Sequence, residues 1–141
     1  MRDVFKYEKR AKYPHMKPRD IEIWERFIAK FPDAYQAVQY DFHVGDPPGF
    51  NPLYDDGTDK NQDALYRLKI DVVGFAGNTI DIIELKPSAG PSTIGQVKGY
   101  KTLYIRDENP KEQVNTVIIT DVENPNMGFL CKSEGVVLIV V

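Results

Sequence analysis

The chain contains a single cysteine among its 141 residues, so it cannot form a disulfide within itself. No cluster of Cys and His has the spacing of a zinc site. Apolar runs also stay short of the about 20 residues that cross a bilayer. The first ten residues, MRDVFKYEKR, carry charges where a signal peptide needs an apolar stretch. These absences predict a protein of the reducing cytoplasm with no membrane partner.

The chain also has no excess of positive charge. It carries 18 Lys and Arg against 21 Asp and Glu, and the formal net charge of −3 is unfavourable for a protein that coats nucleic acid. The charge is unevenly spread, because residues 1–19 hold seven basic and two acidic residues whereas residues 20–59 hold two and nine. We therefore predict a basic N-terminal arm over 1–18, solvated or disordered, with contact to DNA as the alternative.

Residues 19–141 have the length, the composition and the periodicity of one α/β domain. Apolar residues recur at helical spacing in the first part, and alternating or continuous apolar runs typical of strands follow. The expected elements are a helix over about 19–31, strands over 38–44, 65–73 and 79–85, a helix from 92 or 93 to about 104, strands over 114–120 and 136–141, and a loop or short helix at 127–132. Their order is α-β-β-β-α-β-(α)-β.

Side-chain alternation predicts which strand residues share a face. In the first strand one face is expected to carry Val38, Tyr40, Phe42 and Val44. The hairpin strands are expected to be covered on both faces, with Ile70, Val72, Ile83 and Leu85 on one side and Val73, Phe75, Ile80 and Ile82 on the other. Residues 45–62, rich in Pro, Gly, Asp and Asn, are expected to form one long loop.

The chemistry is suggested by three charged residues at the end of this hairpin. If Gly77-Asn78 is a two-residue turn, opposed positions add up to 155 and Asp71 faces Glu84. Opposed Cβ atoms are about 4.5–5.5 Å apart, and Lys86 leaves the same face as Glu84. Two facing carboxylates repel each other unless a cation separates them, so we predict a divalent-metal site that suits Mg²⁺ or Mn²⁺ better than zinc. An exposed salt-bridge set is the alternative.

The same residues resemble a known family. Ile70-Asp71 followed by Ile83-Glu84-Leu85-Lys86 is similar to the motif of the PD-(D/E)XK nuclease superfamily, although Ile70 stands in place of the proline. The αβββαβ core order of that superfamily matches residues 19–120. In the next helix Gln96 and Tyr100 resemble the Q-x-x-x-Y element of one branch, and residues four apart share a helix face. The alternatives are a capping box with Thr93 for Gln96 and a core position for Tyr100.

The resemblance implies a restriction endonuclease-like fold, with a central mixed sheet flanked by helices. It implies that Asp71 and Glu84 bind the metal, that the carbonyl of Leu85 adds a further ligand, and that Lys86 orients or activates the attacking water. Many members also place a glutamate of the first helix near the metal. Glu25, on the inward border of that helix, is the candidate here, with a surface position as the alternative.

We therefore expect a metal-dependent nuclease that hydrolyses phosphodiester bonds in DNA. Basic side chains near the motif are candidates for contacts to phosphate, or else form a solvated face: Arg67, Lys69, Lys98 and Lys101. Cutting both strands at once needs two sites, which a homodimer or a larger assembly would supply. The alternative function is a non-catalytic binding or assembly module of the same fold, for instance a phage or mobile-element structural component, whose acidic residues 20–59 contact a protein partner.

Overall fold

The structure is a computed structural model, and it describes residues 3–46 and 68–141. Most of the loop expected over 45–62 lies outside the described residues, as does the expected start of the second strand. The elements are β1 (Phe5–Lys6), α1 (Pro18–Lys30), β2 (Ala37–Val44), β3 (Leu68–Ala76), β4 (Thr79–Leu85), α3 (Pro91–Glu108), β5 (Gln113–Thr120), α4 (Pro125–Ser133) and β6 (Val137–Val140). Within the described residues, the element order expected for residues 19–141 is confirmed.

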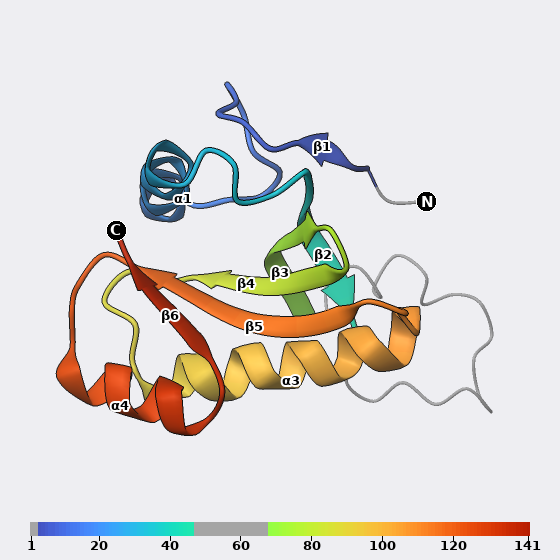
Figure 1. The fold of residues 1–141 in the computed structure, drawn as a ribbon. Coiled ribbons are helices and arrows are strands. Elements are labelled where there is room, and N and C mark those ends of the chain that lie inside the picture. The colour runs from blue at the N-terminus through green and yellow to red at the C-terminus, as the bar shows by residue number, and fades with distance from the viewer. Residues whose placement is uncertain (1–2, 47–67) are drawn as a thin grey trace.

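The described residues form an α+β fold with a six-stranded mixed sheet and three helices. The strands lie in the order in which they occur along the chain; β1 to β4 are antiparallel neighbours, and β4, β5 and β6 are parallel. Helices α3 and α4 cover one face of the sheet, while α1 and the N-terminal segment cover the other (Figure 1). No helix in the described part of the chain has the length and apolarity needed to cross a membrane.

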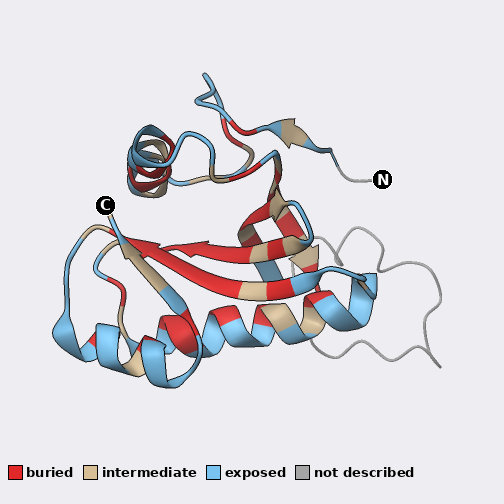
Figure 2. Ribbon diagram, viewed as in Figure 1, coloured by how far each residue is buried: buried red, intermediate tan, exposed pale blue. Residues whose placement is uncertain are grey.

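Two hydrophobic cores lie on the two faces of the sheet. The core beneath α1, called the α1-side core, includes Trp24, Phe27, Tyr40, Val72, Ile83 and Leu85. The core beneath α3 and α4, called the α3-side core, includes Phe42, Ile70, Val73, Ile82, Val97 and Tyr100. The central strands are therefore buried on both sides, and α3 turns its buried residues toward the sheet (Figure 2).

The N-terminal segment belongs to the domain, so the expectation of a solvated or disordered arm is wrong for residues 3–18. β1 pairs with β2, and the side chains of Tyr7 and Tyr13 are buried in the α1-side core. The ring of Tyr7 meets Trp24 edge-on at 5.8 Å between centroids, and Trp24 Nε1 donates to the Tyr40 hydroxyl over 2.9 Å. Aromatic residues interleaved with the basic ones anchor the segment while the charges stay in solvent.

Helix α3 begins one or two residues earlier than expected and ends later. Gly90 is its N-cap and Pro91 its first residue, a position where proline's missing N–H costs nothing. Thr93 is therefore inside the first turn and buried, and the capping box that would have explained Gln96 is not formed. The helix ends at Asn109, whose left-handed conformation lets its N–H reach the Ile105 carbonyl over 2.9 Å.

The turn of the β3–β4 hairpin is the predicted one. Ala76 pairs with Thr79, and the paired positions add up to 155 along the ladder as far as Val72 and Ile83. Gly77 takes the positive φ of 59° that the turn requires. The next two positions in this register are Asp71 and Glu84, so the turn itself determines which two side chains come together at the far end of the hairpin.

In both β2 and β3 the simple alternation of side chains between the two faces of the sheet is interrupted, at neighbouring positions of the two strands. Tyr40 packs in the α1-side core, whereas Phe42 packs in the α3-side core. On the neighbouring strand Val72 lies in the α1-side core and Ile70 in the α3-side core. Asp41, between the first pair, has a left-handed φ of 51°, which breaks simple alternation. The expected common faces for residues 38–44 and for Ile70 with Val72 are therefore wrong.

Gly74 offers a test of how tightly the sheet packs. A Cβ atom at this position would lie 2.6 Å from the ring of Tyr35, which donates a hydrogen bond from its hydroxyl to Asp81. We expect Gly74→Ala to lower the free energy of unfolding by about 1–3 kcal/mol in urea denaturation, because the strand and the ring must move apart. The matched control is Gly99→Ala on α3, where a Cβ meets nothing within 4 Å. That variant should be neutral or stabilising by up to about 1 kcal/mol, and equal losses in both would contradict the close approach.

Candidate metal and catalytic site

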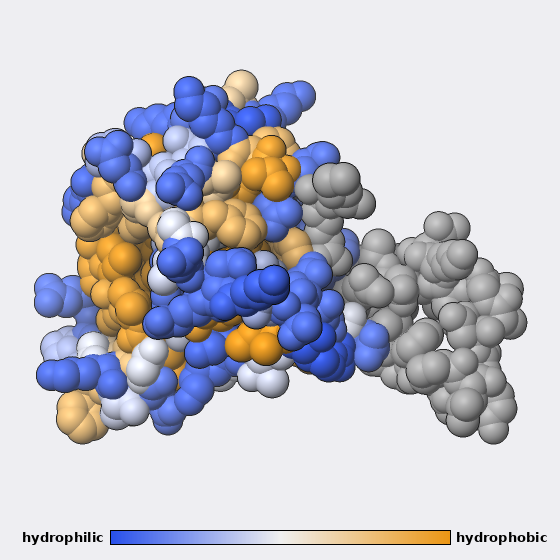
Figure 3. Space-filling model, turned by 45° about the vertical axis from the view of Figure 1, so that its right-hand side comes forward, coloured by the Kyte–Doolittle hydropathy of each residue, from blue (hydrophilic) through white to orange (hydrophobic). Residues whose placement is uncertain are grey.

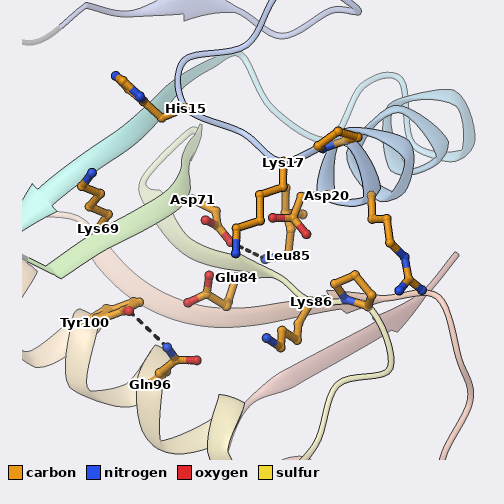
Figure 4. Close-up of a pocket in the computed structure, with 13 residues that line it drawn as sticks. His15, Lys17, Asp20, Lys69, Asp71, Glu84, Leu85, Lys86, Gln96 and Tyr100 are labelled. Atoms are coloured by element: carbon orange, nitrogen blue, oxygen red, sulfur yellow. Dashed lines mark hydrogen bonds between the residues drawn. The ribbon is translucent and has the colours of Figure 1, made fainter.

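A pocket of about 720 Å³ opens where the N-terminal end of α1, the ends of β3 and β4, and the first half of α3 meet. Six of the seven residues predicted for metal binding and catalysis line it: Asp71, Glu84, Leu85, Lys86, Gln96 and Tyr100. Figure 4 shows their polar groups converging from strand and helix on one space. The residues predicted from the hairpin and from α3 are therefore brought together by the fold.

Asp71 and Glu84 differ in how their carboxylates are held. Asp71 is half-buried, and its Oδ2 accepts a hydrogen bond from the backbone N–H of Leu85 over 2.9 Å. This bond links β3 to β4 one step beyond the last backbone pair. Glu84 is only 7% exposed, and its Oε2 is buried without a hydrogen-bond partner in the described structure. A buried acceptor without a partner is costly, so a ligand that satisfies it would be strongly favoured.

The electrostatics of the pocket centre on the same two acids. Burial, and then the neighbouring Asp71 carboxylate, raise the pKa of Glu84 from 4.5 to about 10, although the Lys86 ammonium acts in the opposite direction. Burial and Asp71 likewise raise the pKa of Asp20, against the effect of Lys17 and Lys86. The two nearby lysines therefore do not compensate the negative charge that the carboxylates would carry when ionised. A divalent cation binds well under that condition.

The acid that α1 contributes to the pocket is Asp20, not Glu25. Asp20 lines the pocket from the first turn of the helix, whereas Glu25 does not line it and accepts a hydrogen bond from the Tyr13 hydroxyl over 2.9 Å. Five residues correspond to a rotation of about 140° around a helix, so the two side chains leave in different directions. Sequence offered no signal for Asp20, because an acid in a first helical turn is explained by the helix dipole alone.

Lys86 is held in place by the chain on both sides of it. Its backbone N–H donates to the Ile119 carbonyl of β5 over 3.0 Å, which continues the parallel pairing past the end of β4. Ser88 then takes a left-handed φ of 46°, and its N–H donates to Asp121 Oδ1 over 2.8 Å. These bonds fix the backbone from which the Lys86 side chain reaches the pocket.

Gln96 and Tyr100 share the face of α3 that borders the acids. Gln96 Nε2 and the Tyr100 hydroxyl are 3.4 Å apart in a long hydrogen bond. Burial, followed by the charges of Glu84 and Asp71, raises the pKa of Tyr100 to about 12, so the hydroxyl keeps its proton at neutral pH. The ring of Tyr100 also packs in the α3-side core, as the alternative interpretation of this residue predicted. The two interpretations are compatible, because the ring is buried while the hydroxyl faces the acids.

Basic side chains surround the mouth of the pocket. Lys17, Arg19 and Lys69 line it together with Lys86, and His15 lies at the same rim (Figure 4). Of the other proposed phosphate contacts, Lys98 and Lys101 do not line it. Lys98 instead pairs with Glu134 over 2.6 Å, and Arg67 lies outside the described residues. Four basic side chains thus border the acids Asp20, Asp71 and Glu84 in one pocket.

The donor set fits a hydrated Mg²⁺ or Mn²⁺ ion. Within residues 3–46 and 68–141 no three His, Cys, Asp or Glu side chains form a complete metal-binding group. Mg²⁺ does not need one, because it keeps several water ligands and uses one or two carboxylates. The carboxylates of Asp71 and Glu84, and above all the unpartnered Oε2 of Glu84, are oxygen ligands of the type that such an ion uses.

Comparison of this chain with protein-family models, curated proteins and solved structures gave no match. The resemblance to the PD-(D/E)XK superfamily therefore rests on the residues and their arrangement.

The raised pKa of Glu84 predicts a specific pH dependence of stability in the absence of divalent metal. The folded protein binds a proton that the unfolded chain releases above pH 4.5, so this contribution to stability is lost as the pH rises toward about 10. Between about pH 5 and 9 the free energy of unfolding of the wild type should fall as the pH rises, whereas Glu84→Gln lacks this contribution. The difference between the two slopes should reach up to about 1 kcal/mol per pH unit. Urea denaturation in the presence of a chelator measures it.

Glu134→Gln is the matched control, because Glu134 is exposed and its pKa is lowered by Lys98. Its stability curve should run parallel to that of the wild type over the same pH interval. Parallel curves for Glu84→Gln and the wild type would contradict the burial of an uncompensated carboxyl group at position 84.

Proposed function

We propose that this protein is a metal-dependent nuclease that hydrolyses phosphodiester bonds in DNA. The observation that carries the proposal is the pair of neighbouring carboxylates, Asp71 and Glu84, one position beyond the last pair of the β3–β4 ladder. Glu84 has a buried and unpartnered oxygen, and Lys86 lines the same pocket. A salt-bridge set on the surface would not bury Glu84 to 7% exposure, so the alternative considered for these residues is disfavoured.

A restriction endonuclease-like core is part of this proposal. The run from α1 to β5 has the αβββαβ order, and the sheet is mixed with helices on both faces. The two acids stand at the end of the β3–β4 hairpin, and the Gln96 and Tyr100 pair follows on α3. This agreement between fold and motif positions supports membership of the PD-(D/E)XK superfamily.

Asp71 and Glu84 would hold a Mg²⁺ or Mn²⁺ ion, with the Leu85 carbonyl as a further ligand and Asp20 as the nearest additional acid. Such an ion, when bound, polarises the phosphodiester and lowers the pKa of a water bound to it. The bond between the Leu85 N–H and Asp71 Oδ2 leaves the other oxygen of Asp71 for the ion, and so orients this carboxylate. The protein thus supplies a preorganised set of oxygens at the pocket floor.

The remaining groups would act on the phosphate and the water. The Lys86 ammonium is placed to orient the attacking water and to stabilise the negative charge that develops on the phosphate oxygens. Gln96 and the protonated hydroxyl of Tyr100 can each donate a hydrogen bond into the same space. Water and phosphate would therefore meet between the strand that carries Lys86 and the helix that carries Tyr100.

DNA is the proposed substrate because four basic side chains, those of Lys17, Arg19, Lys69 and Lys86, border the acids of the pocket. Lys17, Arg19 and Lys69 lie where the phosphates on either side of the scissile bond would pass. Local positive charge of this kind attracts a polyanion even when the net charge is slightly negative. Binding through so few phosphate contacts should be moderate and should weaken as salt concentration rises.

The first test is cleavage of single-stranded, double-stranded, nicked and branched DNA with Mg²⁺ or Mn²⁺. We expect activity from the wild type and a loss of about 10²-fold or more in Glu84→Ala and in Lys86→Ala, because each removes a group that acts on the transition state. Asp20→Asn should also lower the rate, whereas Glu25→Gln, away from the pocket, should stay close to wild type. No metal-dependent cleavage of any substrate would favour the non-catalytic assembly module instead.

Metal binding can be measured without activity. We expect Mn²⁺ to raise the melting temperature of the wild type more at pH 8 than at pH 6, because the ion must displace the proton held by Glu84. The stabilisation should be largely lost in Asp71→Asn, which removes one of the two ligands. An equal shift in Asp71→Asn would place the metal elsewhere.

A further inference from the structure

The C-terminal strand β6 is an edge of the sheet that the described residues leave uncovered. It pairs with β5 on one side, from Val117 with Val137 to Thr120 with Val140. Residues 136–141 read VVLIVV, a run without charge, proline or glycine. Apolar surface gathers on the side of the molecule where β6 forms the sheet edge (Figure 3).

Although β6 has only four residues, it lacks the charged side chains, the proline and the bulge that normally prevent an edge strand from pairing with another chain. Edge strands are usually protected by charged side chains, by proline, by bulges or by being very short. The opposite edge fits that pattern, because β1 has two residues and one of them is Lys6. In β6, Val137 is 49% and Val140 39% exposed, and Phe129 on the neighbouring α4 is 74% exposed. Backbone groups and apolar side chains are thus presented together.

A groove of about 440 Å³ runs between α4 and β6, with opposite charges at its two ends. Its floor includes Leu138 and Val140. Because α4 connects two parallel strands, it runs back against the direction of β6. Glu123, just before α4, therefore lies toward the carboxyl end of β6, and Lys132, in the last turn of α4, lies toward its start. Within the described residues neither side chain forms an ion pair.

We propose that β6 pairs with β6 of a second copy of this chain, antiparallel across a two-fold axis, so that the two six-stranded sheets join. Val137 of each copy then lies opposite Val140 of the other, and Leu138 opposite Ile139. A two-fold interface must be complementary to itself. The apolar strand satisfies this condition, because its exposed valines stand at its two ends.

The charges at the ends of the groove favour this arrangement over a parallel one. Antiparallel pairing brings the Lys132 end of one copy to the Glu123 end of the other, and the two-fold axis repeats the contact. Parallel pairing would place each charge beside its own kind, which is unfavourable. Because this pattern of charged and apolar residues is complementary to itself, a second copy of the chain fits the edge better than an unrelated strand does.

The dimer leaves the proposed catalytic pocket open and does not depend on its chemistry. The residues that line the pocket come from the segment before α1, from α1, β3, β4 and α3, and from the turn that follows β4, with none from α4 or β6. Since β4 and β6 are parallel, pockets at the carboxyl end of β4 would lie at opposite ends of the joined sheet. Each copy therefore keeps a complete pocket of its own.

The test is the mass of the intact protein in solution, by sedimentation equilibrium over a wide range of concentrations. The wild type should have twice the monomer mass of 16.1 kDa. Val137→Lys and Val140→Lys should shift it toward the monomer, because a charged side chain on the edge opposes pairing. The matched control is Val4→Lys, a 60% exposed valine beside the opposite edge strand, which should remain dimeric. Circular dichroism confirms that each variant is folded.

Charge reversal tests the register. Lys132→Glu and Glu123→Lys should each weaken the dimer about tenfold or more, since like charges then meet, and the double variant should restore it. A wild type that stays monomeric throughout would overturn the proposal and favour a different partner for this edge. A disruptive Val4→Lys, or a double variant no tighter than the single ones, would overturn it as well.

Discussion

The register of the β3–β4 hairpin is the constraint on which the candidate site depends. A two-residue turn at Gly77-Asn78 pairs the strands so that Asp71 and Glu84 arrive together at the end of the ladder. A slip of one residue would send one of the two carboxylates to the other face of the sheet. The two-residue turn opposes that slip because it sets the register, and the side chains packed on both faces keep the strands in place. The turn thus brings two like charges together at the ladder's end, and the buried strands hold them there.

The site takes its groups from both sides of the sheet. The face change of β2 and β3 lies at the level of Asp71, where backbone pairing with β4 stops and the Asp71 side chain bonds to Leu85 instead. The pocket at this end of the hairpin is bordered by α1 on one side and α3 on the other. Asp20 and Lys17 therefore meet Gln96 and Tyr100 across the acids, although they belong to opposite layers of the fold.

Charge is organised locally in this protein. Basic residues of the N-terminal segment are presented by a backbone anchored through Tyr7, Tyr13 and β1, so Lys17 and Arg19 have defined places at the pocket rim. The far edge of the sheet, at β6, is apolar with one charge of each sign at the ends of its groove. Nucleic-acid binding and self-association would accordingly use separate surfaces.

Sequence alone determined the order of elements, the hairpin turn and the convergence of six pocket residues, because each follows from local periodicity, from turn chemistry or from the spacing of a motif. Three other features depend on tertiary structure: the folding of the N-terminal segment, the face on which Ile70 is buried, and the acid that α1 contributes to the pocket. The N-terminal segment folds because its tyrosines are buried against α1 and β2. Ile70 changes face together with Phe42, its partner on β2, beside the left-handed Asp41. Asp20 replaces Glu25 because the start of α1, and not its middle, reaches the end of the hairpin. These outcomes depend on how elements distant in sequence pack, and no spacing within one element encodes that packing.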